Sequence, residues 1–201
     1  MSYIITIGRQ YGSGGRFIGQ ELAKKLNIKF YDNNLLEKVA ADSGLSISFI
    51  QSHEEKKDSI FAYLGLPEGS NFLAASQRVS IAQFDTISRI AQSNESCVIV
   101  GRCADYILRE YKNLVSVFIH APIEERIARA QKFYNLNVKK VDDYIRKIDK
   151  KRAAYYDYFT NKSWGSADSY DLCLDSSIGI NESVQLIEDF LKIKLKDKVK
   201  F

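Results

Sequence analysis

The segment from Ile4 to Arg16 constrains the fold of this chain more than any other stretch. An apolar run, Ile4 to Ile7, is followed by glycines at positions 12, 14 and 15 and then by a basic residue. Glycines allow successive backbone N–H groups to point at one anion, and a helix that begins near Gly15 adds the positive end of its dipole. The segment therefore predicts a strand, a phosphate-binding loop and a helix, in that order.

The loop departs from the strict phosphate-loop pattern, in which Lys and then Ser or Thr follow the last glycine. In the register that ends on Gly14, this chain has Gly15 and Arg16 at those two positions. A glycine turn that only precedes a helix is the alternative interpretation, and the rest of the chain must decide between the two.

Length and composition set the broad class. The 201 residues, 45% of them hydrophobic, are enough for a full core in one domain with a mobile lid. No run approaches the roughly 18 apolar residues of a membrane span, and no charged and apolar leader precedes Ile4, so we expect a cytoplasmic protein.

The cysteines and the net charge indicate little chemistry by themselves. Cys97, Cys103 and Cys173 lack metal-ligand spacing and are expected to be reduced thiols. A net charge of +4 favours an anionic ligand only if the basic residues converge.

Hydrophobic periodicity predicts an alternation of strands and helices. Strands are expected over 4–7, 29–31, 97–100, 115–119 and 170–174. Helices are expected over 17–26, 35–41, 46–55, 72–92, 104–109 and 138–158, with others that begin at Pro122 and at a cap on Asn181. The β-branched strands alternate with helices, which predicts a parallel sheet covered on both faces. The tail, 192–201, is interpreted as a frayed terminus, with an edge strand or a dimer contact as the alternative.

Separated segments of the chain resemble, in the same order, the cytidylate kinase family. The similarity is most specific in 8–16, 98–102, 119–129 and 149–175 and poorest over about 46–93. More closely, the chain is similar to a cytidylate-kinase-like branch whose loop reads Arg-Gln-Tyr-Gly-Ser-Gly-Gly-Arg, as residues 9–16 do here.

The resemblance implies a three-layer α/β P-loop kinase fold with a central parallel sheet, a helical monophosphate-binding insert and a helical lid. It implies one domain over 1–201, with the core at about 1–32, 96–135 and 170–192, the monophosphate-binding region at about 33–95, the lid at about 136–165 and a basic tail at 192–201. ATP is expected over the loop with Mg²⁺, and CMP or dCMP opposite. Such a reaction needs aligned anions and cations rather than a protein nucleophile.

The family's donor site falls on the loop. The resemblance assigns the ATP phosphates to Gly12, Ser13, Gly14, Gly15 and Arg16. Because Gly15 replaces the usual lysine, Arg16 is expected to curl back toward the phosphates, and Ser13 or water to serve the metal.

The family's acceptor motif falls on Asp32, Asn33 and Lys38, where Lys38 replaces an arginine and so lacks the bidentate fork. Arg102 is expected to contact the acceptor phosphate, while Cys103 replaces a family aspartate. A helix cap is the alternative for Asp32, and an exposed structural arginine is the alternative for Arg102.

Two further clusters of charge are assigned by the same resemblance. Arg126 and Arg129 share a helical face and are candidate substrate-binding residues, with a solvated ion-pair face as the alternative. In the lid, Arg146, Asp149 and Arg152 share a face, and Arg152, oriented by Asp149, is expected to bridge the donor and acceptor phosphates. A plain charged helix is the alternative there.

Two other classes of function stay open at this point. A nucleotide sensor without transfer is favoured by the lost lysine, and a nucleic-acid binder by the basic lid and tail, although the charge is too evenly mixed to prefer it. Transfer to another small hydroxyl metabolite is the nearest kinase alternative. We expect nucleotide substrates, no nucleic-acid or membrane partner, and a monomer or homodimer.

Overall fold

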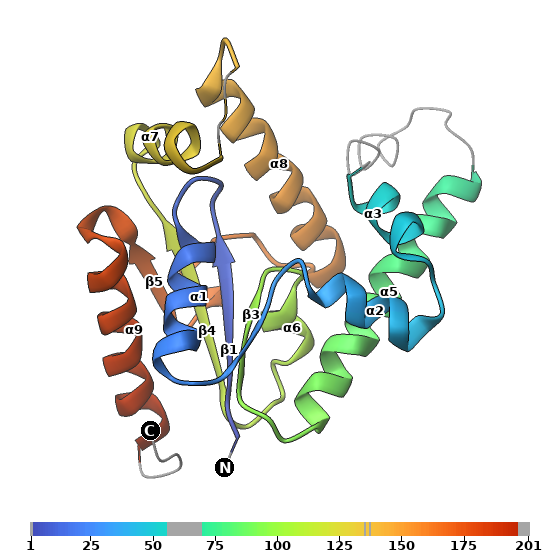
Figure 1. Ribbon diagram of the computed structural model, residues 1–201, viewed down its shortest axis with the longest axis horizontal. Coiled ribbons are helices and arrows are strands. Elements are labelled where there is room, and N and C mark those ends of the chain that lie inside the picture. The colour runs from blue at the N-terminus through green and yellow to red at the C-terminus, as the bar shows by residue number, and fades with distance from the viewer. Residues whose placement is uncertain (1, 56–69, 135, 137, 197–201) are drawn as a thin grey trace.

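The computed structural model describes residues 2–55, 70–134, 136 and 138–196 (Figure 1). Its centre is a five-stranded parallel sheet with the strand order β2-β3-β1-β4-β5. The strands are β1 (Ile4–Arg9), β2 (Lys29–Tyr31), β3 (Cys97–Val100), β4 (Leu114–His120) and β5 (Leu172–Asp175). The predicted parallel sheet is therefore confirmed.

The central position of β1 follows from its sequence. Residues Ile4 to Gly8 are all buried, as expected of a strand with a neighbour on each side and helices on each face. In the register, Ile7 lies opposite Val100 of β3 on one side and Val117 of β4 on the other. All five strands are parallel, so their carboxyl ends lie at one edge of the sheet, where open α/β sheets bind ligands.

Helices cover both faces of this sheet (Figure 1). On one face, α1 (Gly15–Lys25) and α9 (Ile180–Leu195) bury a core that includes Ile5 and Ile7. On the other face, a second core includes Ile4, which points away from Ile5 because successive strand residues alternate. The helices of this second layer are α2 (Leu35–Ser43), α3 (Ile47–Glu55), α5 (Ser70–Gln92) and α6 (Ala104–Ile107).

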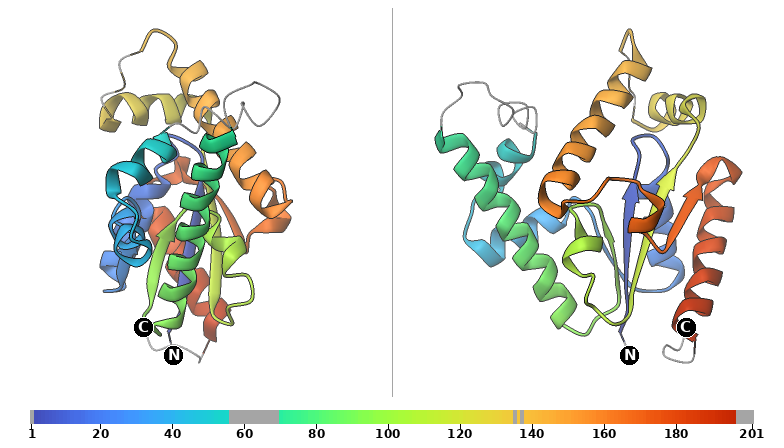
Figure 2. Two further views of the ribbon diagram at one scale, coloured as in Figure 1. Left: turned by 90° about the vertical axis from the view of Figure 1, so that its right-hand side faces the viewer. Right: turned by 180° about the vertical axis from the view of Figure 1, so that it is seen from behind.

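Two helices lie beyond the carboxyl ends of the strands instead of on a face of the sheet. These are α7 (Ile123–Tyr134) and α8 (Val141–Thr160), which are seen above β1 and its following loop in Figure 1 and from two other sides in Figure 2. They bring residues from the third quarter of the chain over the loop that follows β1. In the described part of the chain, no helix is long and apolar enough to cross a membrane.

The end of the chain differs from the sequence prediction. Residues 192–195, predicted as part of a frayed, strand-like tail, continue α9, because Leu191 and Leu195 lie four residues apart on its buried face. Residues 197–201 lie outside the described residues. Gly179, with φ of 118°, precedes this helix as its N-cap, and the predicted cap at Asn181 is wrong.

Candidate active site

The loop after β1 has a conformation that requires glycine. Gly12 and Gly14 have φ angles of 77° and 81°, in the left-handed region that side chains rarely adopt. A Cβ at Gly12 would lie 2.5 Å from the Arg126 carbonyl oxygen, and one at Gly14 would lie 2.6 Å from Cδ1 of Ile180. Conformation and space together exclude side chains here, which leaves backbone N–H groups and the amino end of α1 to face an anion.

Ser13 is held inside this loop. Its side chain is fully buried, and its hydroxyl donates to the Gln10 carbonyl at 2.9 Å. Its own carbonyl accepts hydrogen bonds from Ser176 Oγ at 2.5 Å and from Arg129 Nη1 at 3.2 Å. The hydroxyl expected to serve a metal is therefore turned away from the surface of the loop, and Arg129 lies behind the loop as a brace.

Residues from α7 and α8 hold the loop at Tyr11. The Asp149 carboxylate accepts from the Tyr11 N–H at 2.7 Å, and Arg126 Nε donates to the Tyr11 carbonyl at 2.8 Å. Arg126 and Asp149 also form an ion pair with each other, and the Arg126 side chain is only 7% exposed. Burial raises the pKa of the Asp149 carboxyl. Both backbone groups of Tyr11 are thus bound by one buried ion pair from the helices above it.

Arg152 lies on the cleft side of α8. Its Nη1 donates to the Arg9 carbonyl at 3.0 Å, at the end of β1. Asp149, which was expected to orient Arg152, hydrogen bonds instead to the Tyr11 N–H and to Arg126. Arg152 is therefore positioned by the backbone of β1.

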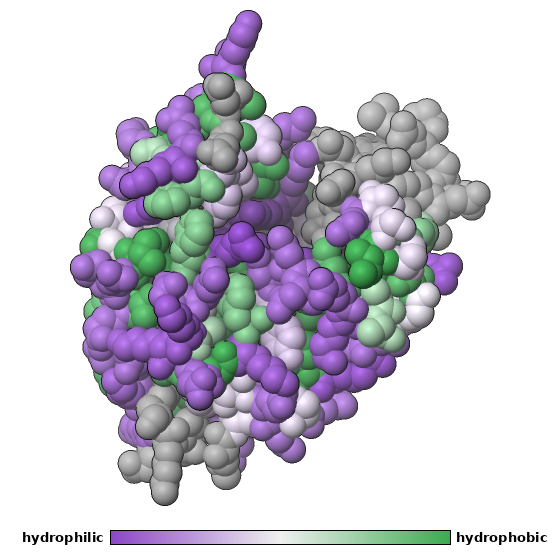
Figure 3. Space-filling model, viewed as in Figure 1, coloured by the Kyte–Doolittle hydropathy of each residue, from purple (hydrophilic) through white to green (hydrophobic). Residues whose placement is uncertain are grey.

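Two cavities meet at the carboxyl edge of the sheet. The first, about 290 Å³, lies over the glycine loop and is lined by Gly12, Gly14, Gly15 and Arg16 among others. The second, about 270 Å³, lies between α8 and the ends of β1 and β3. Both are lined by Arg9, Asp32, Asn33 and Arg152. On the face seen in Figure 3, hydrophilic side chains gather in the hollow below α8.

Asp32 is the negative group at the junction of the cavities. It is 5% exposed and accepts from Arg16 Nε at 2.6 Å, while Arg9 Nη2 lies 4.0 Å from its other oxygen. The alternative of a simple helix cap does not describe it, because the carboxylate faces these arginines and Asn34 stands at the N-cap of α2.

Positive charge exceeds negative charge around the two cavities. Burial and the nearby Arg152 lower the pKa of the Arg9 guanidinium to about 9, and burial lowers the pKa of Arg152. Both side chains still carry their charge at neutral pH. Among the described residues that line the cavities, the cations are Arg9, Arg16, Arg102, Lys151 and Arg152, and the carboxylates are Asp32 and Asp105. Such a surplus of cations around one pair of cavities favours a polyanionic ligand.

The second cavity begins at a strained turn after β3. Gly101, Arg102 and Cys103 have φ angles of 76°, 59° and 55°, and the last two are not glycines. Residues in this region cost of order 1–3 kcal/mol each and are concentrated at ligand sites. The turn places Arg102 on the cavity wall.

An aromatic wall closes the far side of the second cavity. It consists of Tyr155, Tyr156, Trp164 and Tyr170. Tyr156 donates from its hydroxyl to the Asp105 carboxylate at 2.7 Å, and burial raises the pKa of that carboxyl. Rings of this size suit a planar ligand group or an apolar ring system.

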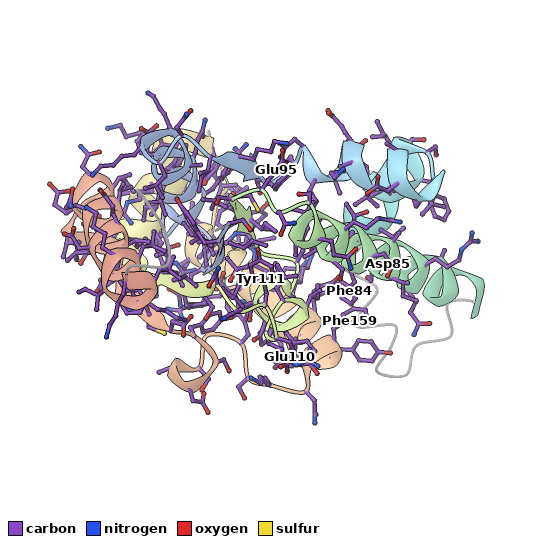
Figure 4. All side chains as sticks on the ribbon, turned by 90° about the horizontal axis from the view of Figure 1, so that it is seen from below. Phe84, Asp85, Glu95, Glu110, Tyr111 and Phe159 are labelled. Atoms are coloured by element: carbon purple, nitrogen blue, oxygen red, sulfur yellow. The ribbon has the colours of Figure 1, made fainter. Side chains whose placement is uncertain are left out.

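The α8 face that carries Tyr155 is supported by α5. Tyr155 donates to Ser80 Oγ at 3.2 Å, and the rings of Phe84 and Phe159 meet edge to face with centroids 5.1 Å apart. Figure 4 shows Phe84 and Phe159 next to each other, from α5 and α8 respectively. The wall of the cavity is therefore supported by contacts between residues of two helices that lie 75 positions apart in the sequence.

Some of the residues predicted from sequence lie away from both cavities. Lys38 lies on α2 and is paired with Asp42 at 3.9 Å, and Arg146 is exposed on α8. Neither lines either cavity. Arg126 and Arg129 contact the backbone of the loop from behind.

Sequence reasoning missed several residues of the site. Arg9 lines both cavities, and Asp105, Trp164 and Tyr170 line the second. The position of Arg9, a basic residue at the end of an otherwise apolar strand, could have indicated that it belongs to the site. The aromatic residues carried no signal, because rings in a sequence most often belong to the core.

The sheet order, the glycine loop between β1 and α1, and the cationic helix above them define a P-loop kinase fold. The cytidylate kinase-like family model matches residues 4–178, and the chain belongs to this family. Phosphoryl transfer is the general chemistry that this membership and fold support.

Solved structures share the fold. An uncharacterised protein from Eubacterium ventriosum ATCC 27560 is 27% identical, with a TM-score of 0.74, over 95% of this chain and 99% of that one. Shikimate kinase from Aquifex aeolicus is 20% identical, with a TM-score of 0.53, over 96% of this chain and 99% of that one. A gluconokinase from Sinorhizobium meliloti is 12% identical, with a TM-score of 0.51, over 96% of this chain and 97% of that one. The comparison with curated proteins gave no match.

Proposed function

We propose that this protein transfers the γ-phosphoryl group of ATP to the phosphate of a nucleoside monophosphate, with CMP or dCMP as the favoured acceptor. The observation that carries the proposal is the meeting of two cavities at Arg9, Asp32, Asn33 and Arg152. Transfer between two bound anions requires such a junction, where both phosphates can be aligned and shielded.

The donor phosphates fit the loop cavity. Gly12 and Gly14, in left-handed turns, line this cavity with backbone and no side chain, and the amino end of α1 faces the same space. Arg16 lines this cavity beside Asp32. Magnesium, which neutralises charge on the β- and γ-phosphates when bound, takes one or two carboxylates together with phosphate oxygens and water. Asp32 is the carboxylate that the described part of the loop cavity offers.

The acceptor is assigned to the second cavity. Arg102 lies on its wall to bind the acceptor phosphate, and the aromatic wall suits a nucleobase. Arg152 belongs to both cavities, so its guanidinium is placed to bridge the two phosphates as charge develops. Its hydrogen bond to the Arg9 carbonyl fixes it in advance, which lowers the cost of ordering it during the reaction.

The segments 33–95 and 136–165 are assigned as the monophosphate-binding region and the lid of one kinase domain. The ion pair of Asp149 with Arg126 would then couple closure of the lid to the position of the loop. We place the reaction in the cytoplasm, with a monomer or homodimer and without a nucleic-acid or membrane partner.

Two specific observations support other functions. The buried hydroxyl of Ser13 and the glycine at position 15 favour a nucleotide sensor that binds ATP without transfer. The structural neighbours include enzymes named for shikimate and gluconate, which favours a small hydroxyl acceptor in the same cavity.

One panel separates these functions. ATP and Mg²⁺ are incubated with each nucleoside monophosphate, with shikimate, with gluconate and with no acceptor, and ADP release is measured. Release with CMP or dCMP and not with the others supports the proposal. Release with shikimate or gluconate alone overturns the acceptor, and tight ATP binding without release in any arm supports the sensor.

A further inference from the structure

We infer that Arg9 supplies the positive charge that the loop lacks at Gly15, and that its guanidinium binds the transferred phosphoryl group. This rests on the proposed function. In an ordinary P-loop, the lysine at the start of the helix reaches the β- and γ-phosphates. Here the cation comes from the end of β1, six residues earlier in the chain.

Arg9 leaves no space for a side chain at position 15. A Cβ built on Gly15 would lie 2.6 Å from Cβ and 3.2 Å from Cγ of Arg9. Real Cβ atoms do not approach other carbons at the shorter of these distances, so the stem of Arg9 occupies the space where the side chain of a lysine would start. Arg9 therefore requires a glycine at position 15, and the two residues together replace the lysine of an ordinary P-loop.

A second glycine makes room for the charged end of Arg9. A Cβ at Gly101 would lie 1.9 Å from Nη1 and 3.0 Å from Cζ of Arg9. Gly101 has a φ of 76°, so the turn after β3 also needs glycine for its conformation. The guanidinium thus lies between the end of β3 and Asp32, at the junction of the two cavities.

The guanidinium is available to a ligand. The Arg9 side chain is 23% exposed to solvent. Its ion pair with Asp32 is long, with 4.0 Å between Nη2 of Arg9 and Oδ1 of Asp32. The closer partner of Asp32 is Arg16, at 2.6 Å. An arginine that mainly neutralised Asp32 would be expected to lie close to its carboxylate, as Arg16 does and Arg9 does not.

The charge environment supports the same role. Arg9 is surrounded by Arg152 and Arg102, and burial together with these neighbours lowers its pKa. A cluster of arginines with one shared carboxylate is unfavourable until a polyanion binds it. Phosphates at the junction would relieve this repulsion, with Arg9 offering two N–H groups in a planar fork.

The step needs no proton from Arg9. The bond from the γ-phosphorus to the bridging oxygen of ATP breaks, its electron pair leaves with ADP, and a bond forms to an oxygen of the acceptor phosphate. Charge on the three equatorial oxygens of the transferred group is what the guanidinium stabilises. Arg9 stays protonated throughout.

The experiment compares Arg9→Ala and Arg9→Lys with wild type, and uses Arg109→Ala as the matched control. Arg109 follows α6, pairs with Glu110 at 3.7 Å and lines neither cavity. With ATP, Mg²⁺ and CMP at saturation, Arg9→Ala is expected to lower kcat by about 100-fold or more, as removal of one transition-state donor does. Arg9→Lys should regain part of this loss, and Arg109→Ala should match wild type. Thermal unfolding of Arg9→Ala is expected within about 4 °C of wild type. A kcat of Arg9→Ala within threefold of wild type overturns the inference.

A double variant, Arg9→Gly with Gly15→Lys, tests whether Arg9 replaces the lysine. Arg9→Gly removes the Cβ that a side chain at position 15 would meet, and Gly15→Lys then places a lysine there. The double variant is expected to exceed Arg9→Gly in kcat by about tenfold, whereas Gly15→Lys alone should be less active than wild type because its Cβ meets Arg9. A folded double variant that is no faster than Arg9→Gly overturns the replacement.

Binding separates failure of this inference from failure of the proposed function. If wild type releases no ADP with any acceptor, the proposed transfer is wrong, and affinity for ATP is measured by calorimetry. Arg9→Ala is expected to bind ATP about tenfold more weakly than wild type, and Arg109→Ala is expected to bind it as tightly as wild type. Equal affinity of Arg9→Ala and wild type under those conditions overturns the role of Arg9.

Discussion

The carboxylate of Asp149 accepts a hydrogen bond from the backbone N–H of Tyr11 at 2.7 Å, although 138 residues separate the two. The contact joins α8 to the glycine loop and is completed by Arg126, which donates to the carbonyl of the same residue. The position of the loop therefore depends on an ion pair supplied by the helices above it.

Replacement of Asp149 by Ala should lower the free energy of unfolding by about 3 kcal/mol, because the buried Arg126 loses its partner. Arg126→Ala should cost a similar amount, and the double variant less than the sum. Urea unfolding of the four proteins measures this coupling. Asp142→Ala, at an exposed position on the same helix, is the control and should change stability by less than about 0.5 kcal/mol. Additive effects of Asp149→Ala and Arg126→Ala would contradict the prediction.

Gly12 and Gly44 form a matched pair for a test of the loop. Both have positive φ, 77° and 71°, but a Cβ at Gly12 would meet the Arg126 carbonyl at 2.5 Å, whereas Gly44 has nothing within 4 Å. Gly44→Ala should therefore cost only the conformational penalty of about 1 kcal/mol. Gly12→Ala should cost about 1–3 kcal/mol more and should also weaken ATP binding. Equal losses of stability in the two variants would show that the close approach to Arg126 is absent.

Much of the fold could be predicted from local sequence. The β-branched runs at 97–100 and 115–119 identified buried parallel strands because such strands are apolar on both faces. The glycine loop identified the start of α1 because few other residues allow its backbone conformation. The end of α9 was missed because alternating Lys and apolar residues fit an exposed strand as well as a helix that buries every fourth residue.

The candidate site could be predicted only in part. The resemblance to the cytidylate kinase family singled out Arg102 and Arg152, and both line the second cavity. The role of Arg9 depends on its distance from Gly15 and Gly101, which no spacing in the sequence encodes. The partner of Asp149 was missed for the same reason, since Tyr11 is far away in the chain and contributes only its backbone.

Acid should weaken the contact between α1 and α9. Hydrogen bonds from Lys192 and Lys25 lower the pKa of Glu188 below its ordinary value of 4.5. The folded state thus binds this proton less readily than the unfolded state, and the stabilisation is present above about pH 4.5 and lost as pH falls through the folded pKa. Glu188→Gln should be less stable than wild type at pH 7, by about 0.2–1 kcal/mol, and equal to it near pH 2. The unfolding free energy of both proteins is measured against pH. Glu110→Gln, at a position 90% exposed, is the control and should match wild type in stability at pH 7.

The thiol of Cys97 should be protected from alkylation in the native protein. It is fully buried where β3 meets the second core, and burial raises its pKa to about 12, so very little thiolate exists at pH 8. Cys173 is half-buried at the sheet edge and should react first with iodoacetamide. Mass spectrometry of peptides after timed labelling gives the two rates, and increasing urea should accelerate Cys97 in step with global unfolding. Reaction of Cys97 as fast as Cys173 in the absence of urea would mean that β3 opens to solvent without unfolding of the core.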